Sequence, residues 1–251
     1  MYKRRTLSVV MPAYNEADGI TSVVRAFAEI PEVDEIIVAD NNSSDGTGDL
    51  AKRAGARVVL ETRQGYGFAC RAALEASTGD YTVIVESDAT FRASDLYKFM
   101  AYAEDFDAVF GTRTSKACIW SGANMGWFLR CGNVAVAKLL EYLHNGPCMT
   151  DVGCTYKLFT RRSLSQLLPL LTVGDSRLSP EILIVIIRMK LHCIEIPVNY
   201  GSRLGTSKIT GSLVRAIKLG LRMILLIFRC RLITFPEPAG LESVKEDSAR
   251  C

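Results

Sequence analysis

Two carboxylates one residue apart stand where a predicted buried strand ends. Glu86 and Asp88 follow the apolar run of residues 81–85, with Ser87 between them and Thr90 two positions beyond. Such a pair can bind a hard divalent cation, because Mg²⁺ is usually held by one or two carboxylates together with the phosphate oxygens of a substrate. The spacing alone is equally typical of solvated turn residues, so the surrounding elements have to decide between the two interpretations.

Strand and helix patterns alternate along most of the chain. Short apolar runs rich in β-branched residues predict strands, and each run is followed by a polar loop or a helical pattern. The predicted strands cover residues 7–11, 35–39, 57–60, 81–85, 107–110 and 195–198. This spacing predicts an α/β fold with a Rossmann-like, mostly parallel sheet flanked by helices on both faces.

The carboxyl ends of these strands are rich in polar residues. Ligands of parallel sheets bind beyond that edge, so side chains from five strand ends should line one cleft for a charged ligand. These residues are Tyr14, Glu16, Asp40, Gly65, Glu86, Asp88 and Arg113. The glycine-rich turn at Gly65 could bring backbone N–H groups to a phosphate. It lacks the third glycine of the dinucleotide fingerprint, which disfavours an NAD site, and the chain has no P-loop sequence.

Composition narrows the class further. The 251 residues are 49% hydrophobic and 23% charged, which suits one large globular domain, and a net charge of +3 gives no reason to expect a nucleic-acid partner. The eight cysteines include no C-x-x-C pair and are accompanied by only two histidines, which disfavours zinc. The apolar run after the basic N-terminus is short and broken by Pro12, so we expect no secretory signal and a reducing, cytoplasmic setting.

Three sequence stretches carry a resemblance to a known family. Met-Pro-Ala-Tyr-Asn-Glu at residues 11–16, Val-Ala-Asp-Asn-Asn-Ser-Ser-Asp-Gly-Thr at 38–47 and Gly-Asp-Tyr at 79–81, leading to Glu86, resemble family 2 glycosyltransferases of the GT-A fold. Within that family the chain is most similar to the dolichyl- and polyprenyl-phosphate mannose and glucose synthases. The resemblance implies an inverting enzyme that takes a hexose from a nucleoside-diphosphate sugar, GDP- or UDP-linked, with Mg²⁺ or Mn²⁺ as cofactor.

The resemblance also implies roles for individual residues. The expected metal ligands are Glu86, Asp88 and Thr90. The expected nucleotide-sugar contacts are Pro12, Tyr14, Glu16, Asp40, Gly65 and Ser87. The expected catalytic residues are Asp88, Asp151, Arg113 and Arg130, and the acceptor phosphate is expected at Arg203, Ser207 and Lys208.

Three positions in two motifs depart from the family pattern. The metal motif is usually Asp-x-Asp, so Glu86 carries one extra methylene. In the acceptor-side motif around Asp151, Thr155 replaces the usual Gly and Lys157 the usual Arg. Some of these residues also have purely structural interpretations. Arg130 can extend its charged end from a helix to solvent, Asp151 can cap a helix or turn, and the lysines can be solvent-exposed surface residues.

The C-terminal part predicts a separate element. Residues 211–233 combine an apolar face with five basic residues, which is typical of a helix lying on an anionic membrane surface, whereas packing on the main domain of residues 1–210 is the alternative. The continuous apolar run of residues 223–228 is too short to span a bilayer. Residues 234–251 form a polar tail that we expect to be disordered.

Three functions remain open from the sequence. The favoured one is hexose transfer to a polyprenyl phosphate by an enzyme that is peripheral on the cytosolic membrane face. The second is transfer to a soluble or polysaccharide hydroxyl, which would require a general base, with Asp151 as the first candidate. The third is a non-catalytic membrane partner that binds nucleotide-sugar. The sequence gives no indication of the oligomeric state.

Overall fold

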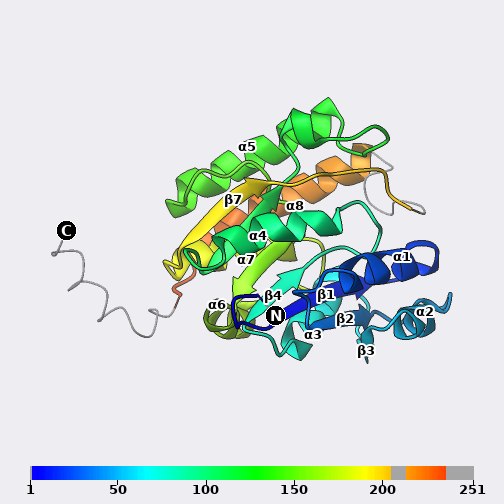
Figure 1. The fold of residues 1–251 in the computed structure, drawn as a ribbon. Coiled ribbons are helices and arrows are strands. Elements are labelled where there is room, and N and C mark those ends of the chain that lie inside the picture. Colours follow the sequence, from blue (N-terminus) through cyan, green and yellow to red (C-terminus); the bar gives the residue numbers. More distant parts are fainter. Residues whose placement is uncertain (1, 205–212, 236–251) are drawn as a thin grey trace.

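The protein is built around one seven-stranded sheet with the strand order β3-β2-β1-β4-β6-β5-β7 (Figure 1). The computed structural model describes residues 2–204 and 213–235. The strands are β1 (Leu7–Ala13), β2 (Glu35–Asp40), β3 (Arg57–Leu60), β4 (Tyr81–Ile84), β5 (Ala108–Thr112), β6 (Lys157–Thr160) and β7 (Cys193–Pro197). All six predicted strands are confirmed, with bounds that shift by no more than two residues.

One strand was not predicted. β6 is antiparallel and lies between β4 and β5, with Thr160 opposite Tyr81 and Phe159 opposite Ala108. The other neighbouring strands pair in parallel. The sheet is therefore mostly parallel, as expected, but its antiparallel strand separates β4 from β5 and widens the edge at which their carboxyl ends open.

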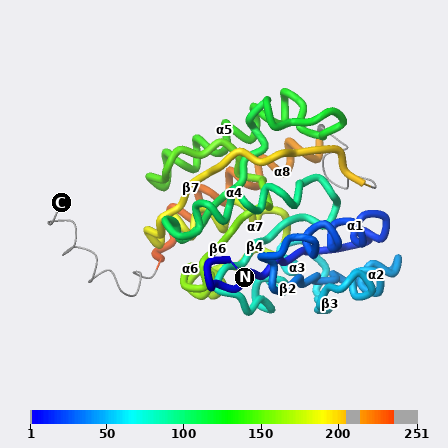
Figure 2. Tube along the Cα trace, viewed as in Figure 1, coloured from blue at the N-terminus to red at the C-terminus, as the bar shows by residue number. Residues whose placement is uncertain are grey.

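Helices cover both faces of the sheet (Figures 1 and 2). They are α1 (Ala17–Ala28), α2 (Thr47–Arg53), α3 (Tyr66–Ala76), α4 (Leu96–Tyr102), α5 (Trp127–His144), α6 (Arg161–Leu167), α7 (Leu178–Arg188) and α8 (Leu213–Leu232). Three short 3₁₀ turns, Ala93–Asp95, Lys116–Cys118 and Leu168–Leu170, connect them. The described part of the chain is thus a three-layer α/β fold.

The pleat of the strands divides the buried side chains into two cores. In β1, Val9 and Met11 face the core that α1 and α4 cover, whereas Val10 faces the core formed with α3 and α7. All seven residues of β1 are buried. A strand that is buried on both faces has a continuous apolar sequence. This is why residues 7–11 predict a strand although polar and apolar residues do not alternate there.

Helix α8 has two apolar faces. One packs against α5 and α7 and buries Met223 and Ile227. The other leaves large apolar side chains exposed at helical spacing: Val214, Ile217, Leu221, Leu225, Phe228 and Leu232. Packing on the main domain, the alternative interpretation of this segment, is therefore observed, and a second apolar stripe faces outward. No helix within residues 2–204 and 213–235 is both long and apolar enough to cross a membrane.

Candidate active site

A cavity of about 440 Å³ opens beyond the carboxyl ends of β1, β4 and β5. Nine of the residues expected from the sequence line it: Pro12, Tyr14, Glu16, Glu86, Ser87, Asp88, Thr90, Arg113 and Arg203. These side chains come from four separate parts of the chain, which the sheet order brings together. The predicted convergence on one cleft is thus present for the named residues that follow β1, β4 and β5, but not for Asp40 and Gly65.

The loop of residues 86–90 turns sharply as it leaves β4. Ala89 adopts a left-handed backbone with a φ of 63°, a conformation that costs an L-residue about 1–2 kcal/mol. This turn lets the Thr90 backbone N–H and hydroxyl both donate to Asp88 Oδ1, at 3.0 and 2.6 Å. Asp88 is therefore held in one orientation at the cavity wall, and its Oδ2 is left for other partners. Strained backbone of this kind is concentrated at functional sites.

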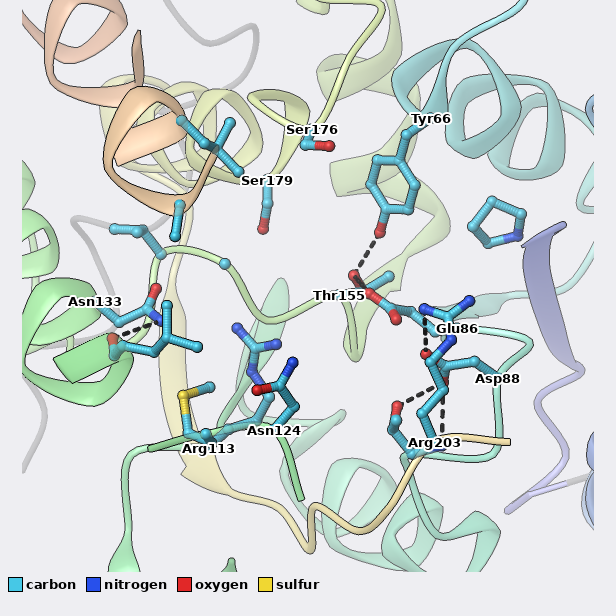
Figure 3. A pocket seen from close by; sticks show the side chains of 18 of the residues that line it. Tyr66, Glu86, Asp88, Arg113, Asn124, Asn133, Thr155, Ser176, Ser179 and Arg203 are labelled. Carbon is cyan, nitrogen blue, oxygen red and sulfur yellow. Dashed lines mark hydrogen bonds and ion pairs between the residues drawn. The ribbon is translucent and has the colours of Figure 1, made fainter. Parts of the chain in front are cut away.

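The Glu86 carboxyl group is desolvated beside Asp88. Burial, and then the negative charge of Asp88, raise the pKa of Glu86 above its usual range, although Arg113 acts in the opposite direction. The Thr155 hydroxyl donates to Glu86 Oε1 at 2.8 Å (Figure 3). Two carboxylates kept this close in a partly dry site favour the binding of a positive charge.

Arg203 supplies a positive charge from the segment after β7. Its guanidinium lies 3.2 Å from Asp88 Oδ2 and also contacts the Glu16 carboxylate. Two backbone hydrogen bonds hold this segment against the 86–90 loop. They run from Leu204 N to Asp88 O at 3.0 Å and from Gly201 N to Thr90 O at 2.8 Å. The residues that follow, including Ser207 and Lys208, lie outside the described part of the chain.

The donor set suits a divalent cation that is completed by a ligand. Among residues 2–204 and 213–235, no cluster of three or more His, Cys, Asp or Glu side chains could hold a metal on its own. Glu86 and Asp88 supply two carboxylates, and an acidic pair that already attracts a guanidinium has the charge for a cation. Mg²⁺ and Mn²⁺ need few protein ligands when substrate phosphates and water fill the remaining positions. The residues present therefore fit such an ion.

Arg113 and Asp151 form a buried ion pair at the back of the cavity. Arg113 donates to both Asp151 oxygens from its side chain, at 2.8 and 2.9 Å, and its backbone N–H adds a third bond. The Asp151 side chain is fully buried, and although burial raises the pKa of this carboxyl, Arg113 holds it below its usual value. Asp151 does not line the cavity. The structure thus shows Asp151 as the partner that orients Arg113, and its role as general base toward a hydroxyl acceptor stays a prediction.

Three other expected residues lie outside the lining of this cavity. Asp40 ends β2 as predicted, but it lines a separate hollow beside α2, and its Oδ1 accepts a bond from Ser43 N at 3.0 Å. Arg130 lies on α5 and is not among the residues that line the cavity. Gly65 is required for packing, because a Cβ there would come within 2.4 Å of the Gly174 carbonyl oxygen. Close approach of α3 to the 173–175 segment therefore explains why residue 65 is glycine, and its contact with the nucleotide-sugar stays a prediction.

Several cavity residues were not predicted. Tyr66 and Thr155 are joined by a hydrogen bond of 2.5 Å between their hydroxyl oxygens. Asn124, Asn133, Ser176 and Ser179 add polar groups on the side away from Glu86 (Figure 3). Thr155 lies in the acceptor-side motif, but its contact with the cavity was not predicted. No motif marks the other positions, because they come from loops and helices that only the fold brings together.

One buried lysine supports that side of the cavity. Lys157 in β6 is almost fully buried, and its ammonium donates to Ser179 Oγ at 2.8 Å and also to the Cys154 carbonyl oxygen. Burial lowers the pKa of Lys157. The solvated lysine considered from the sequence is thus not observed, and Lys157 fixes α7 to the central strand.

The apolar wall of the cavity lies between α5 and α8. It is formed by Met125, Phe128, Leu129, Val136, Ile217, Leu219 and Met223. Since α5 and α8 pack side by side, this wall continues directly into the exposed stripe of α8. The cavity is therefore charged at one end and apolar at the other.

The sheet with helices on both faces is that of the GT-A fold. A family model described as Glycosyl transferase family 2 matches residues 8–168, and the chain belongs to this family. An uncharacterized glycosyltransferase of Mycobacterium tuberculosis (strain ATCC 25618 / H37Rv) is 33% identical over 211 residues, which cover 82% of this chain and 91% of that protein. The predicted family, fold and enzyme class are thereby confirmed.

Two further proteins are similar to the chain. A dolichyl-phosphate hexose transferase of Haloferax volcanii is 31% identical over 204 residues, covering 81% of this chain and 86% of that protein. Glucosyl-3-phosphoglycerate synthase from Mycobacterium tuberculosis, crystallised with Mn²⁺, UDP and phosphoglyceric acid, superposes with a TM-score of 0.71 at 24% identity. The match covers 92% of this chain and 80% of the synthase. At that identity the likeness establishes the fold alone.

Proposed function

We propose that the protein transfers a hexose from a nucleoside-diphosphate sugar to a polyprenyl phosphate, with inversion at the anomeric carbon. The observation that carries this proposal is the shape of the cavity, which runs from the Glu86 and Asp88 carboxylates to an apolar wall between α5 and α8. A sugar diphosphate suits the charged end, and an isoprenoid chain suits the apolar end.

The donor would bind at the charged end. Pro12, Tyr14 and Glu16 form one wall there, and Ser87 donates its hydroxyl to the Pro12 carbonyl oxygen at 2.9 Å, which fixes the two loops together. Mg²⁺ or Mn²⁺ held by Asp88, Glu86 and Thr90 would neutralise the charge that develops on the departing nucleoside diphosphate. Asp40 stays a proposed contact of the base, beyond the lining of the cavity.

The acceptor would bring its own nucleophile. A phosphate oxygen is already ionised near neutral pH, so it needs no general base, whereas a hydroxyl does. The carboxylate expected to serve as base for a hydroxyl acceptor, Asp151, is paired with Arg113 through both of its oxygens. Arg113, fixed by that pair, and Arg203 are the cations that would orient the acceptor phosphate, with Ser207 and Lys208 proposed to assist. This arrangement favours a phosphate acceptor.

The relatives support both acceptor classes to different extents. The Haloferax relative is named for dolichyl-phosphate hexose transfer, which is the chemistry proposed here. The synthase that shares the fold was crystallised with phosphoglyceric acid, a soluble acceptor. Asn124, Asn133, Ser176 and Ser179 give the cavity polar groups that could bind such a molecule, so a soluble acceptor is the second candidate.

A membrane location follows from the lipid acceptor. The exposed apolar stripe of α8 continues the apolar wall of the cavity, and Arg215, Lys218, Arg222, Arg229 and Arg231 lie on the same helix. A basic amphipathic helix of this kind binds at the surface of an anionic bilayer, with its apolar side chains among the acyl chains. We place the enzyme as a peripheral protein on the cytosolic membrane face, where α8 would present the cavity to the lipid.

The donor half of the proposal is tested by nucleoside-diphosphate release. Purified protein is incubated with a panel of GDP- and UDP-hexoses and polyprenyl phosphate, with Mg²⁺, with Mn²⁺ or with EDTA. We expect release from one donor only when a divalent cation is present, and a loss of at least 100-fold in Asp88→Asn. Turnover in EDTA, or an unchanged Asp88→Asn variant, would overturn the metal-dependent mechanism.

A further inference from the structure

Three side chains link helix α3 to the metal motif. The Tyr66 hydroxyl is 2.5 Å from Thr155 Oγ1, and Thr155 Oγ1 is 2.8 Å from Glu86 Oε1 (Figure 3). Thr155 is only 4% exposed. The bond to Glu86 uses the Thr155 proton, so Tyr66 donates to Thr155 and the three groups form one directed chain that ends on the carboxylate.

The chain restrains a side chain that would otherwise have several orientations. Glu86 has one more rotatable bond than an aspartate, and ordering a glutamate costs more rotamer entropy than ordering a shorter side chain. Thr155 is β-branched and therefore stiff about χ1. It lies two residues before β6, at the centre of the sheet, where Lys157 is bonded to Ser179 and Cys154. A rigid donor thus holds the flexible acid.

Both partners also stand at positions where the chain departs from the motifs of the family that it resembles. Glu86 stands where the metal motif usually has Asp, and Thr155 stands where the acceptor-side motif usually has Gly. An aspartate at position 86 would be shorter by one C–C bond, about 1.5 Å, and would leave the Thr155 hydroxyl out of reach. A glycine at position 155 would offer no hydroxyl. Glu86 can therefore form this hydrogen bond with Thr155 but not with a glycine, and Thr155 can form it with a glutamate but not with an aspartate.

We propose that Glu86 and Thr155 are a matched pair, in which Thr155, supported by Tyr66, is a positioning residue that fixes the Glu86 carboxylate toward the cation site. Thr155 would act on metal binding only through Glu86. The inference rests on the proposed metal-dependent function, because it requires a cation between Glu86 and Asp88. It goes beyond that function because it explains why position 86 is a glutamate by the hydroxyl of Thr155, 69 positions further along the chain.

The test measures the dissociation constant of Mn²⁺ alone, from the free Mn²⁺ signal in electron paramagnetic resonance, so that no nucleotide or acceptor has to be known. Thr155→Val removes the hydroxyl and keeps the shape, and we expect it to weaken Mn²⁺ binding about tenfold, as is typical of partners that orient a metal ligand. Thr155→Ser keeps the hydroxyl and should stay within threefold of the wild type. Tyr66→Phe should weaken binding by a smaller factor.

A matched control separates this effect from the general loss of a hydroxyl group. Thr78 donates its hydroxyl to Glu35 at 2.7 Å, which is a bond of the same kind at an exposed site far from the cavity. Thr78→Val should leave the Mn²⁺ constant unchanged. The thermal unfolding midpoint of every variant is measured in parallel. If Thr155→Val lowers this midpoint, the Mn²⁺ constant of Thr155→Ser is compared with that of the wild type instead.

The decisive comparison is a double-mutant cycle with Glu86→Asp. Because Thr155 cannot reach an aspartate, Thr155→Val should cost less than threefold in the Glu86→Asp background and about tenfold in the wild type. An equal loss in both backgrounds, or a loss below threefold in the wild type, would overturn the matched pair and leave the proposed function intact. A wild-type protein that binds no Mn²⁺ would contradict the metal-dependent function and this inference together.

Discussion

At the scale of single residues, Arg203 is the side chain whose position has the clearest consequence. Its guanidinium contacts Asp88 and Glu16 from the segment that follows β7. A guanidinium and a divalent cation cannot both neutralise Asp88 Oδ2 at short range. Arg203 is therefore expected to compete with the metal until a diphosphate arrives, and then to pair with the phosphate oxygens.

The Arg203→Ala variant tests this competition. Removing the guanidinium should tighten the binding of Mn²⁺ alone by several-fold, because Asp88 loses its internal partner, and should weaken the binding of nucleoside diphosphate in the presence of Mn²⁺. Both constants are accessible by titration calorimetry. Arg57→Ala, which removes an arginine paired with Glu35 far from the cavity, is the control. Weaker binding of Mn²⁺ alone by Arg203→Ala would contradict the competition.

The Arg113–Asp151 pair gives a prediction about stability. The two side chains are 11% and 0% exposed, so Asp151→Asn leaves a buried guanidinium without its counter-charge and should lower the free energy of unfolding by about 3–5 kcal/mol. Urea denaturation measures this change. Lys138→Ala, which breaks an exposed pair with Glu141, should cost less than about 1 kcal/mol. A loss of similar size in both variants would show that Asp151 is not a structural partner of Arg113.

The sequence identified most of the charged residues of the site but not their pairing. Glu86 and Asp88 could be predicted as site residues because they follow a strand, and the carboxyl ends of parallel strands meet at one edge of the sheet. The bond from Thr155 to Glu86 spans 69 positions and depends on β6, which the alternation of strands and helices does not predict. The packing constraint on Gly65 could not be predicted, because a glycine required by close packing looks the same in sequence as one that admits a phosphate.

At the scale of elements, Glu35 joins three strands at the end of the sheet opposite the cavity. Its carboxylate accepts bonds from Ser8, which lies in β1, from Thr78 before β4 and from Arg57 in β3. Burial raises the pKa of Glu35, but these bonds outweigh it and hold the pKa at about 2, below the ordinary value of 4.5.

This depressed pKa predicts how acid acts on the sheet. A carboxylate with a lowered pKa in the folded state stabilises the protein fully above pH 4.5, and the contribution is lost as the pH falls from 4.5 toward 2. The urea midpoint of the wild type should therefore fall more steeply between about pH 5 and about pH 3 than that of Glu35→Gln. Parallel curves for the two proteins would show that Glu35 does not contribute to the acid sensitivity.

The strand that the sequence did not predict explains part of the site. β6 is four residues long and contains a buried lysine, Lys157, so neither its hydropathy nor its length suggests a central strand. Its place between β4 and β5 sets Thr155 beside Glu86 and Lys157 beneath Ser179. The strands that were predicted are longer or more apolar, and each is followed by the polar loop that marks its end.

The exposed stripe of α8 predicts membrane binding. Leu221 and Leu225 are 58% and 69% exposed, so replacing both by Glu should leave the fold intact while placing two negative charges against an anionic surface. We expect sedimentation with phosphatidylglycerol-containing vesicles to fall by at least tenfold. Leu60→Glu, at a leucine that is 67% exposed on β3, should bind as the wild type does. Unchanged sedimentation of the double variant would rule out this stripe as the membrane contact.

At the scale of the whole molecule, the order of the strands is what makes the site. β1 and β4 are neighbours in the sheet, whereas 67 residues separate the end of one from the start of the next along the chain. Their adjacent ends place Pro12, Ser87 and Asp88 around one cavity, and α5 and α8 close it on the apolar side. The α/β class and the edge at which ligands bind were predictable, because parallel sheets follow general rules. The apolar wall was not, since it requires two helices distant in sequence to pack together.

The central claim is that one cavity joins a sugar-nucleotide site to a lipid-phosphate site. The most direct measurement is mass spectrometry of the lipid fraction after the purified protein is incubated with Mg²⁺, polyprenyl phosphate in detergent and the donor from which it releases nucleoside diphosphate. The account predicts a new lipid heavier by one hexose, formed by the wild type and absent with Asp88→Asn. Release of nucleoside diphosphate with transfer of the hexose to phosphoglyceric acid or another soluble acceptor, and none to the lipid, would contradict it.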